Sequence, residues 1–244
     1  MKIFITGGLG FVGTRLTALL LQKGHRVTVI ERNPRGKPAP PDGVSVIEGD
    51  ASRPGPWQDA LAGHDAVVNL AGVSIFSRWS RQKKEEIRGS RVLITGNVAD
   101  AILKKKKGNI ALISASAVGY YGFRGDEKLT EVDAPGDDFL ARVCRDWEAE
   151  ALRAAEQGAR VVRARFGVVL GRKGGAMDIL TRIFRLRLGN RLGAGRQWFS
   201  WIHEDDLAAA LLFLLEKRAI SGPVNCSAPE PVTNRELTRA LNRA

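Results

Sequence analysis

The sequence has few of the residues that build disulfide scaffolds and metal clusters. Its 244 residues include two cysteines, Cys144 and Cys226, which stand far apart without a Cys-x-x-Cys spacing. This excludes a disulfide framework, argues against a cysteine zinc site and fits a reducing compartment. No apolar run approaches the roughly 18 residues of a membrane span, and residues 1–5 run into glycines without the apolar stretch of a signal peptide. We therefore expect a cytoplasmic protein that does not contact a membrane.

Acidic residues are also scarce relative to basic ones. The chain has 38 Lys and Arg against 26 Asp and Glu, a formal charge of +12. A basic surface is typical of nucleic-acid binding, and residues 104–107 are four consecutive lysines. However, this run ends an expected helix, where cations complement the helix dipole, and the arginines are not interleaved with stacking aromatics. We favour a solvated surface, and nucleic-acid binding is the weaker alternative.

Short apolar runs alternate with helical patterns over the first two thirds of the chain. The expected strands are residues 2–6, 26–30, 44–48, 66–70, 110–114 and 160–166, and the expected helices are 11–24, 56–62, 80–103 and 138–157. Such alternation is typical of right-handed βαβ units. The sequence therefore predicts an α/β fold with a Rossmann-type doubly wound parallel sheet.

A glycine-rich loop joins the first strand to the first helix. It reads Thr-Gly-Gly-Leu-Gly-Phe-Val-Gly over residues 6–13. Gly7 permits the tight turn, Gly10 lets the backbone approach a pyrophosphate and Gly13 allows close helix–strand packing, while the helix N-terminus with Phe11 and Val12 faces the anion. Because the next strand also follows in register, we predict dinucleotide binding by residues 7–13.

The residues after the second and third strands bear on the choice between NAD and NADP. A carboxylate at Glu31 favours NAD, because it accepts hydrogen bonds from both ribose hydroxyls and repels a 2′-phosphate. Arg32 and Arg35 favour NADP, because guanidinium groups clamp that phosphate. The sequence contains both features and leaves the choice open. Asp50 is placed to reach the adenine, with capping of the next helix as an equal alternative.

Past residue 167 the pattern changes to glycine- and arginine-rich connections. A tryptophan-containing segment at 198–202, a helix at 205–216, a short run at 223–227 and a helical start at 234 complete the chain. We predict a dinucleotide-binding Rossmann domain over 1–166 and a small substrate-binding lobe over 167–244, at the edge of the sheet where doubly wound folds bind ligands.

Several segments together resemble the extended short-chain dehydrogenase/reductases, and more closely the atypical "epimerase family" branch of nucleotide-sugar epimerase-like proteins. They are TGGLGFVG at 6–13, GDAS at 49–52, NLAG at 69–72, ISASAVGYYG at 113–122, RFGVVLG at 165–171 and WIHEDD at 201–206. The resemblance covers essentially the whole chain. Relatives usually continue for some tens of residues, so we expect this chain to be truncated.

The resemblance implies a role for individual residues. The glycines of the loop would hold the pyrophosphate, Asp50 the adenine, and the backbone of Leu70, Ala71 and Gly72 would flank the nicotinamide side. Ser116 matches the family's catalytic Ser/Thr, which hydrogen-bonds a substrate hydroxyl or carbonyl. From the residues alone, a strand-end serine that caps its own backbone is an equal interpretation.

The usual acid/base pair of the family is missing. Typical members use a Tyr and a Lys one helical turn later, so that the ammonium activates the phenol and holds the ribose. On the helix where the pair is expected, Leu140 and Cys144 stand at those positions. The two tyrosines of the chain, Tyr120 and Tyr121, lie near Ser116 and are the alternative source of a phenol, activated by Arg124 or by the cofactor. Packing of these two rings is the competing interpretation.

Other side chains are candidates for substrate binding. Arg165, Arg196, Trp198 and Trp201 suit an anionic or ring-bearing substrate. Packing in the lobe is their alternative role and applies most strongly to Trp201. His203 and Asp206 have workable metal spacing, but a strand-to-helix junction explains them better, and we predict no metal.

Two classes of function fit these observations. The first is a cytosolic NAD(P)-dependent oxidoreductase or epimerase-like enzyme that acts on a small carbonyl or hydroxyl substrate, with a nucleotide- or sugar-linked compound as one option. The second is a non-catalytic dinucleotide-binding module for redox sensing or scaffolding. The resemblance also implies a homodimer through helices 80–103 and 138–157.

Overall fold

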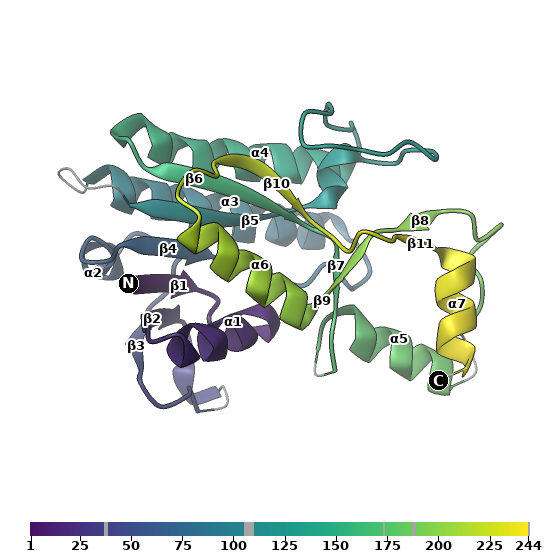
Figure 1. Ribbon diagram of the computed structural model, residues 1–244, viewed down its shortest axis with the longest axis horizontal. Helices are drawn as coiled ribbons and strands as arrows, with labels where there is room; N and C mark the ends of the chain where they lie inside the picture. Colours follow the sequence, from purple (N-terminus) through teal and green to yellow (C-terminus); the bar gives the residue numbers. More distant parts are fainter. Residues whose placement is uncertain (37–38, 105–109, 173, 187–188, 244) are drawn as a thin grey trace.

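β-branched and apolar residues fill the strands, as expected where a sheet is covered on both faces. The computed structural model describes residues 1–36, 39–104, 110–172, 174–186 and 189–243 (Figure 1). Its main sheet has the order β10-β6-β5-β4-β1-β2-β3, with every neighbouring pair parallel. The strands are β1 (Lys2–Thr6), β2 (Arg26–Glu31), β3 (Val44–Glu48), β4 (Ala66–Asn69), β5 (Ala111–Ala117), β6 (Arg160–Phe166) and β10 (Gly222–Cys226). The predicted Rossmann-type sheet is confirmed.

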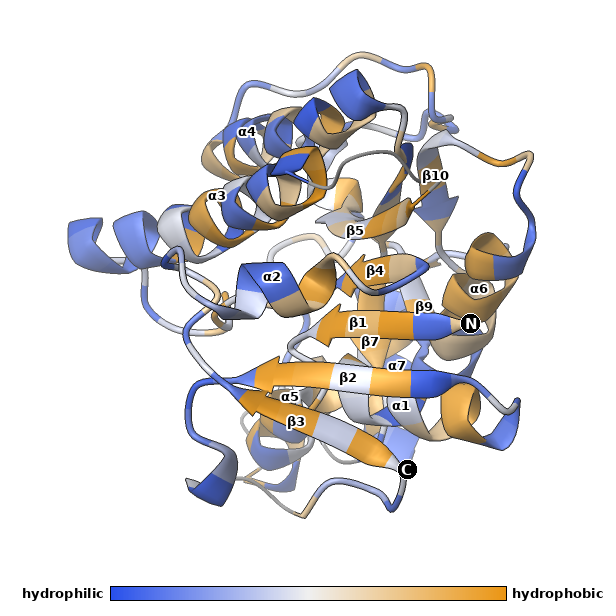
Figure 2. Ribbon diagram, turned by 90° about the vertical axis from the view of Figure 1, so that its left-hand side faces the viewer, coloured by the Kyte–Doolittle hydropathy of each residue, from blue (hydrophilic) through white to orange (hydrophobic). Residues whose placement is uncertain are grey.

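Successive residues of β1 face opposite helix layers. Ile3 and Ile5 pack in the cluster that contains Leu16 and Leu211, from α1 (Phe11–Gln22) and α6 (Glu204–Glu216). Phe4 points to the other face, which is covered by α2 (Trp57–Leu61), α3 (Arg81–Lys104) and α4 (Phe139–Arg153). Figure 2 shows α2, α3 and α4 together on one side of the strands. The period of two along a strand thus builds both cores.

The remaining elements form a lobe beside the carboxyl edge of the sheet (Figure 1). β7 (Val168–Leu170) pairs in parallel with β9 (Trp201–His203), and β8 (Trp198–Phe199) pairs antiparallel with β11 (Val232–Thr233). The helices are α5 (Gly175–Arg185) and α7 (Asn234–Arg243). Three short 3-10 turns complete the described structure: η1 (Pro34–Gly36), η2 (Val118–Tyr121) and η3 (Ala154–Gln157).

The structure does not divide into two consecutive parts at residue 166, where the sequence predicted the boundary. The chain returns from the lobe to the sheet, because α6 packs on α1 and β10 pairs with β6. Residues 204–226, predicted to belong to the lobe, are therefore part of the sheet domain. The lobe consists of an insertion between β6 and α6 together with the segment that follows β10.

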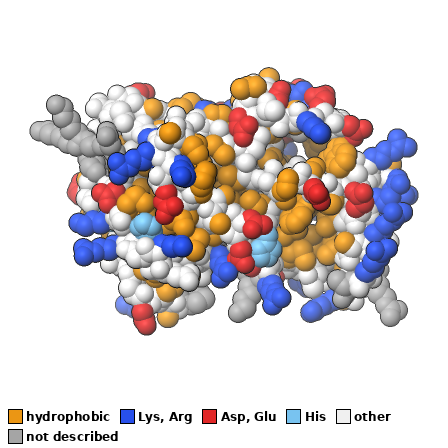
Figure 3. Space-filling view, viewed as in Figure 1, with side chains coloured by type: hydrophobic (Ala, Val, Ile, Leu, Met, Phe, Trp, Pro, Cys, Tyr) orange, Lys and Arg blue, Asp and Glu red, His pale blue; other side chains and the backbone are white. Residues whose placement is uncertain are grey.

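Basic side chains are spread over the face shown in Figure 3 and gather at the end that carries α7. Within α7, Arg235, Arg239 and Arg243 recur every fourth residue and so share one side of the helix. Lys104 ends α3, whereas residues 105–107 of the lysine run lie outside the described residues. Within the described parts of the chain, no helix combines the length and apolar character that crossing a bilayer requires.

Candidate functional site

The glycine loop is shaped so tightly that side chains do not fit. Gly7 has a φ of +70°, and its backbone carbonyl oxygen accepts a hydrogen bond from the Gly10 N–H at 3.0 Å. A Cβ at Gly7 would lie 3.0 Å from the Ala71 nitrogen, and a Cβ at Gly13 would overlap the Gly7 carbonyl oxygen. The loop therefore requires glycine at these positions, and its surface there is formed by backbone groups rather than by side chains.

The N-terminus of α1 has no acceptor of its own. Gly10 is the N-cap, no side chain caps the helix, and no acidic residue stands in its first turn. The N–H groups of Phe11, Val12 and Gly13 therefore lack intrahelical partners and attract an anion. The predicted pyrophosphate-binding residues thus form a cradle whose donors and dipole fit a dinucleotide.

The ends of β2 and β3 carry the residues that bear on the 2′-phosphate. The Glu31 carboxylate turns back and accepts a 3.0 Å hydrogen bond from the Arg32 N–H, while the Arg32 side chain is exposed. Asp50 accepts hydrogen bonds from the Ser52 N–H at 2.9 Å and hydroxyl at 2.7 Å. Partial burial opposes ionisation, but these bonds and the charges of Arg32 and Arg53 outweigh it and lower the pKa of Asp50. Asp50 closes a turn and does not cap α2, whose N-cap is Pro56.

A buried polar chain fixes the segment that follows β4. The Thr6 hydroxyl donates to Asn69 Oδ1 at 2.6 Å and accepts from the Ala71 N–H at 3.3 Å. The Asn69 amide in turn donates to the Thr95 hydroxyl at 2.7 Å. The backbone of Leu70 and Ala71 therefore lies against Gly7 of the glycine loop. That Leu70, Ala71 and Gly72 flank the nicotinamide side of a cofactor stays a prediction.

Ser116 lies at the end of β5 in a buried charged cluster. Its hydroxyl donates to Glu148 Oε1 at 2.7 Å, and the side chain of Glu148 also accepts from Arg165 Nε at 2.8 Å and Nη2 at 3.0 Å. Ser116, Glu148 and Arg165 are 2%, 3% and 1% exposed. Burial alone would lower the pKa of Arg165, but its hydrogen bonds with Glu148 and Tyr121 outweigh burial and raise it. We call Ser116, Tyr121, Glu148, Arg163 and Arg165 the Glu148 cluster.

The two tyrosines occupy different environments. The Tyr121 hydroxyl donates to Asn225 Oδ1 at 2.7 Å and accepts from Arg165 Nη1 at 2.9 Å, so both of its hydrogen-bonding functions are used. The ring of Tyr120 lies 3.5 Å from the Arg165 guanidinium carbon, and its hydroxyl makes no hydrogen bond to the described residues. Arg124 donates to the backbone oxygen of Tyr121 rather than to a phenol. Of the two phenols, only that of Tyr120 is available to a ligand.

The helix α4 presents Leu140, Cys144 and Glu148 at four-residue intervals on the side that faces β5. Cys144 is 4% exposed, and burial together with the charge of Glu148 raises the pKa of its thiol to about 11. The thiol is therefore protonated at neutral pH, which disfavours a role of Cys144 as a nucleophile.

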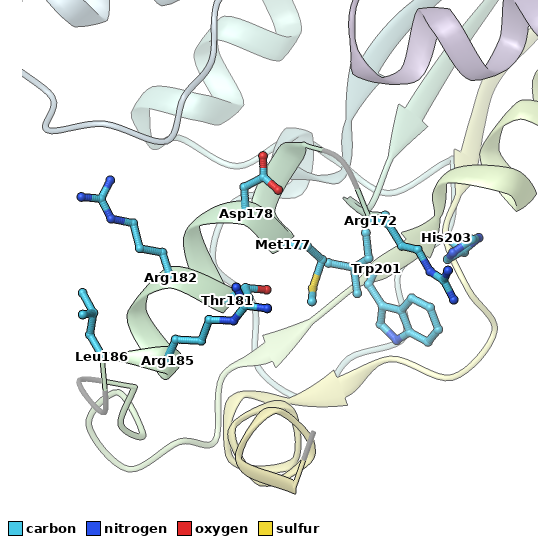
Figure 4. A pocket seen from close by; sticks show the side chains of 11 residues that line it. Arg172, Met177, Asp178, Thr181, Arg182, Arg185, Leu186, Trp201 and His203 are labelled. Carbon is cyan, nitrogen blue, oxygen red and sulfur yellow. The ribbon is translucent and has the colours of Figure 1, made fainter.

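A cavity of about 890 Å³ lies in the lobe, between α5, β7 and β9 (Figure 4). Met177, Thr181 and Arg185 of α5 line it on one side and Trp201 and His203 of β9 on the other. Arg172 and Arg182 also line it, and no ion pair of the three arginines occurs within the described residues. Trp201 is one of the predicted candidates for substrate binding, whereas Arg172 and the lining residues of α5 were not predicted as ligand groups.

The predicted substrate-binding residues do not meet in the structure. Arg165 is enclosed in the Glu148 cluster, the Trp198 indole donates to Asp126 at 2.6 Å, and Arg196 is exposed beside β8. Their contact with a substrate stays a prediction. His203 Nδ1 accepts from the Asp205 N–H at 3.2 Å and caps α6, as a strand-to-helix junction requires.

The sequence analysis did not identify Glu148, although this residue accepts hydrogen bonds from both Ser116 and Arg165. The signal was available in principle, because a glutamate at the buried position of an amphipathic helix requires a partner. The partners themselves are 32 and 17 residues away in the chain, and no local pattern joins them.

Comparison with known proteins gives consistent matches. The model of the NAD dependent epimerase/dehydratase family matches residues 3–226. The chain is 38% identical over 244 residues to "Epimerase family protein YfhF" from Bacillus subtilis, covering 100% of this chain and 79% of that protein. It is 39% identical over 249 residues to the human "Epimerase family protein SDR39U1", covering 100% of this chain and 80% of that protein.

Solved structures match over the same length. A crystal structure of human SDR39U1 with NADPH has a TM-score of 0.80 and 37% identity, covering 99% of this chain and 80% of that chain. A nucleoside-diphosphate sugar epimerase from Corynebacterium glutamicum has a TM-score of 0.84 and 41% identity. The match to the Corynebacterium protein covers 99% of this chain but only 49% of that longer chain.

Proposed function

The chain belongs to the NAD-dependent epimerase/dehydratase family, and we propose that it is an NAD(P)-dependent oxidoreductase or epimerase acting on a small hydroxyl or carbonyl compound. The family and the Rossmann fold make it an NAD(P)-binding protein. A nucleotide-linked sugar is our preferred substrate class, because a relative at 41% identity is named a nucleoside-diphosphate sugar epimerase.

One observation carries the proposal: the dinucleotide cradle after β1 and Ser116 at the end of β5 lie at the same edge of the sheet, on the two strands that flank β4. Thr6, which precedes the cradle, pairs with Asn69, and Asn69 pairs with Ser114, two residues before Ser116. In open α/β sheets, ligands bind outside the carboxyl ends of the strands. A cofactor held at the cradle therefore shares this crevice with a substrate held at Ser116.

When bound, the nicotinamide cofactor supplies or accepts a hydride. The loop backbone and the N-terminus of α1 hold the pyrophosphate, and Leu70 to Gly72 border the neighbouring part of the crevice. Ser116 donates its single proton to Glu148, so its oxygen is left to accept a hydrogen bond. This polarity suits a substrate hydroxyl, which donates, and Ser116 would orient that hydroxyl.

The proton that accompanies hydride transfer needs a group other than the missing Tyr/Lys pair. We assign this role to Tyr120, whose hydroxyl has no partner among the described residues and whose ring is held against Arg165. Tyr121 serves instead to bind Asn225 and Arg165. A Tyr120→Phe variant is expected to lose turnover while retaining NADPH, whereas Tyr121→Phe is expected to lose stability.

We expect NADPH to be preferred over NADH. The carboxylate of Glu31 is engaged by the backbone of its own loop, while Arg32 is exposed and available to a 2′-phosphate. The human relative crystallised with NADPH has the same fold.

The experiment that tests this function is a titration of purified protein with NADPH and NADH, followed by a substrate screen. Nicotinamide fluorescence reports binding, and hydride transfer is followed by nicotinamide absorbance with nucleotide sugars and with simple alcohols and ketones. Saturable NADPH binding and turnover of one compound are expected. Binding of neither cofactor would contradict the proposal.

A second candidate is a non-catalytic NADP(H)-binding module. It is favoured by Leu140 and Cys144 at the positions of the usual pair, since Cys144 is buried with a protonated thiol. Tight NADPH binding without turnover of any compound in the screen would support it.

For cellular context, we propose a cytoplasmic protein, since Cys144 and Cys226 are free and buried. The Arabidopsis relative is named chloroplastic, which applies to that protein. We also propose a homodimer through α3 and α4, which expose Leu93 and Leu152. Nucleic-acid binding remains the weaker alternative.

A further inference from the structure

Helix α3 carries a partly buried arginine that has no acidic partner. The Arg91 guanidinium donates through Nη1 to the carbonyl oxygens of Val73 and Ile87, both at 3.1 Å. Among the described residues, no carboxylate lies within 4.0 Å of it, whereas Arg88 on the same helix pairs with Asp146 at 2.8 Å. Burial lowers the pKa of Arg91, yet an arginine remains charged at neutral pH. The crevice thus contains an uncompensated positive charge.

The guanidinium is held in a fixed place. A Cβ at Gly72 would lie 3.3 Å from its central carbon, so the absence of a side chain at Gly72 lets Arg91 lie along the backbone. Its central carbon is also 5.3 Å from the ring centre of Trp147 on α4. The two carbonyl acceptors use Nη1 only, and Nε and Nη2 make no hydrogen bond to the described residues. Neither is among the fully buried unpaired atoms, so both stay open to a ligand.

Arg91 lies between the dinucleotide cradle and Ser116. On one side, Gly72 follows Ala71, which approaches Gly7 of the cradle. On the other side, its guanidinium carbon lies 5.3 Å from the ring centre of Trp147, the residue next to Glu148, which accepts a hydrogen bond from Ser116. A dinucleotide that reaches from the pyrophosphate cradle to the reacting atoms near Ser116 passes this arginine.

The same contacts explain how the site works without a lysine on α4. Cys144 stands where that cation is expected, and the Arg91 guanidinium from α3 lies against Trp147, three residues further along α4. A guanidinium fork also matches vicinal hydroxyls and phosphate oxygens better than an apolar neighbour does. The positive charge is therefore supplied by α3 rather than α4.

We propose that Arg91 binds the nicotinamide nucleotide half of the cofactor, through its ribose hydroxyls and the adjoining phosphate. This inference rests on the proposed function, because it presupposes a dinucleotide in the cradle. It adds a binding residue on α3 and gives a reason for glycine at residue 72, where a Cβ would crowd the guanidinium at 3.3 Å.

The test compares NADPH with 2′,5′-ADP, which contains the adenine half and the 2′-phosphate but no nicotinamide nucleotide. Calorimetric titrations of both ligands are made with the wild type, Arg91→Met, Arg91→Lys and the control Arg88→Met. Arg91→Met is expected to weaken NADPH binding by between about tenfold and a hundredfold, the effect of losing hydrogen bonds to a charged donor. Its affinity for 2′,5′-ADP should stay within about twofold of the wild type.

The other variants separate binding from folding. Arg91→Lys keeps the charge and should recover part of the NADPH affinity, while Arg88→Met removes an exposed ion pair and should bind both ligands as the wild type does. If Arg91→Met does not fold, the Lys variant still gives the ratio of the two affinities. An unchanged NADPH affinity, or an equal loss for both ligands, would overturn this inference alone. A wild type that binds neither ligand would overturn the proposed function as well.

Discussion

At the β1 end of the site the groups that face a ligand are backbone amides, whereas at the β5 and β6 end they are side chains held by buried charges. The cradle depends on the absence of side chains, since there is no room for a Cβ at Gly7 or Gly13. The Glu148 cluster depends on one side chain, since Ser116 and Arg165 both donate hydrogen bonds to the Glu148 carboxylate. The first region can therefore fail without loss of the fold, while the second contributes to stability as well as to the site.

The largest effect is expected from breaking the Glu148 cluster. A Glu148→Ala change leaves Arg165 charged and buried without its carboxylate partner, which costs about 3–5 kcal/mol of unfolding free energy. Urea denaturation measures the loss. Glu150→Ala on the same helix removes only a partly exposed pair with Arg153 and is expected to cost less than about 1 kcal/mol. Equal stability of the two variants would contradict the assigned role of Glu148.

The next largest effect concerns the cradle. In Gly13→Ala the new Cβ would overlap the Gly7 carbonyl oxygen, so the loop must shift away from its ligand. We expect NADPH affinity to fall by about a hundredfold, measured by fluorescence titration. Gly125→Ala is the control, because nothing lies within 4 Å of its Cβ position. If Gly13→Ala binds NADPH normally, the cradle does not hold the pyrophosphate.

A smaller effect, on cofactor preference, is expected from changing Arg32, at the end of β2. Arg32→Ala should lower the preference for NADPH over NADH by about tenfold, because a charge-assisted contact with the 2′-phosphate is lost. NADH affinity should not change. Arg26→Ala, at the opposite end of β2, is the matched control. A parallel loss for both cofactors would show that Arg32 acts on the loop and not on the phosphate.

The smallest effect at neutral pH is expected at Cys144. Its pKa is raised to about 11 in the folded protein, against about 8.5 in an unfolded chain. Between these values the unfolded chain releases a proton that the folded one retains, so stability falls as pH rises above about 8.5. Thermal unfolding of Cys144→Ala should show a shallower fall than the wild type. Identical pH profiles would mean that the thiol titrates normally.

The cradle could be predicted from the sequence because its signal is local. Strand, loop and helix follow one another, and the spacing of Gly7, Gly10 and Gly13 reflects backbone geometry within a single turn. The parallel sheet was predicted for the same reason, since each βαβ unit is continuous in the chain.

The Glu148 cluster and Arg91 could not be predicted, because their contacts join separate elements. Glu148 and Arg165 meet only when α4 packs on β6, and Arg91 reaches Trp147 only when α3 packs beside α4. The return of β10 to the sheet was missed similarly, since its five residues contain Gly222 and Pro223 and have weak strand preference.

The position of β10 also affects how the protein is made. β6 leaves the ribosome well before its outer partner, because most of the lobe and α6 are synthesised between the two strands. Until β10 arrives, β6 is the open edge of a parallel sheet, and such an edge pairs readily with strands of other chains. Nascent chains that stall within the lobe are therefore the species most exposed to aggregation, and chaperone engagement is expected to be strongest over this interval of translation.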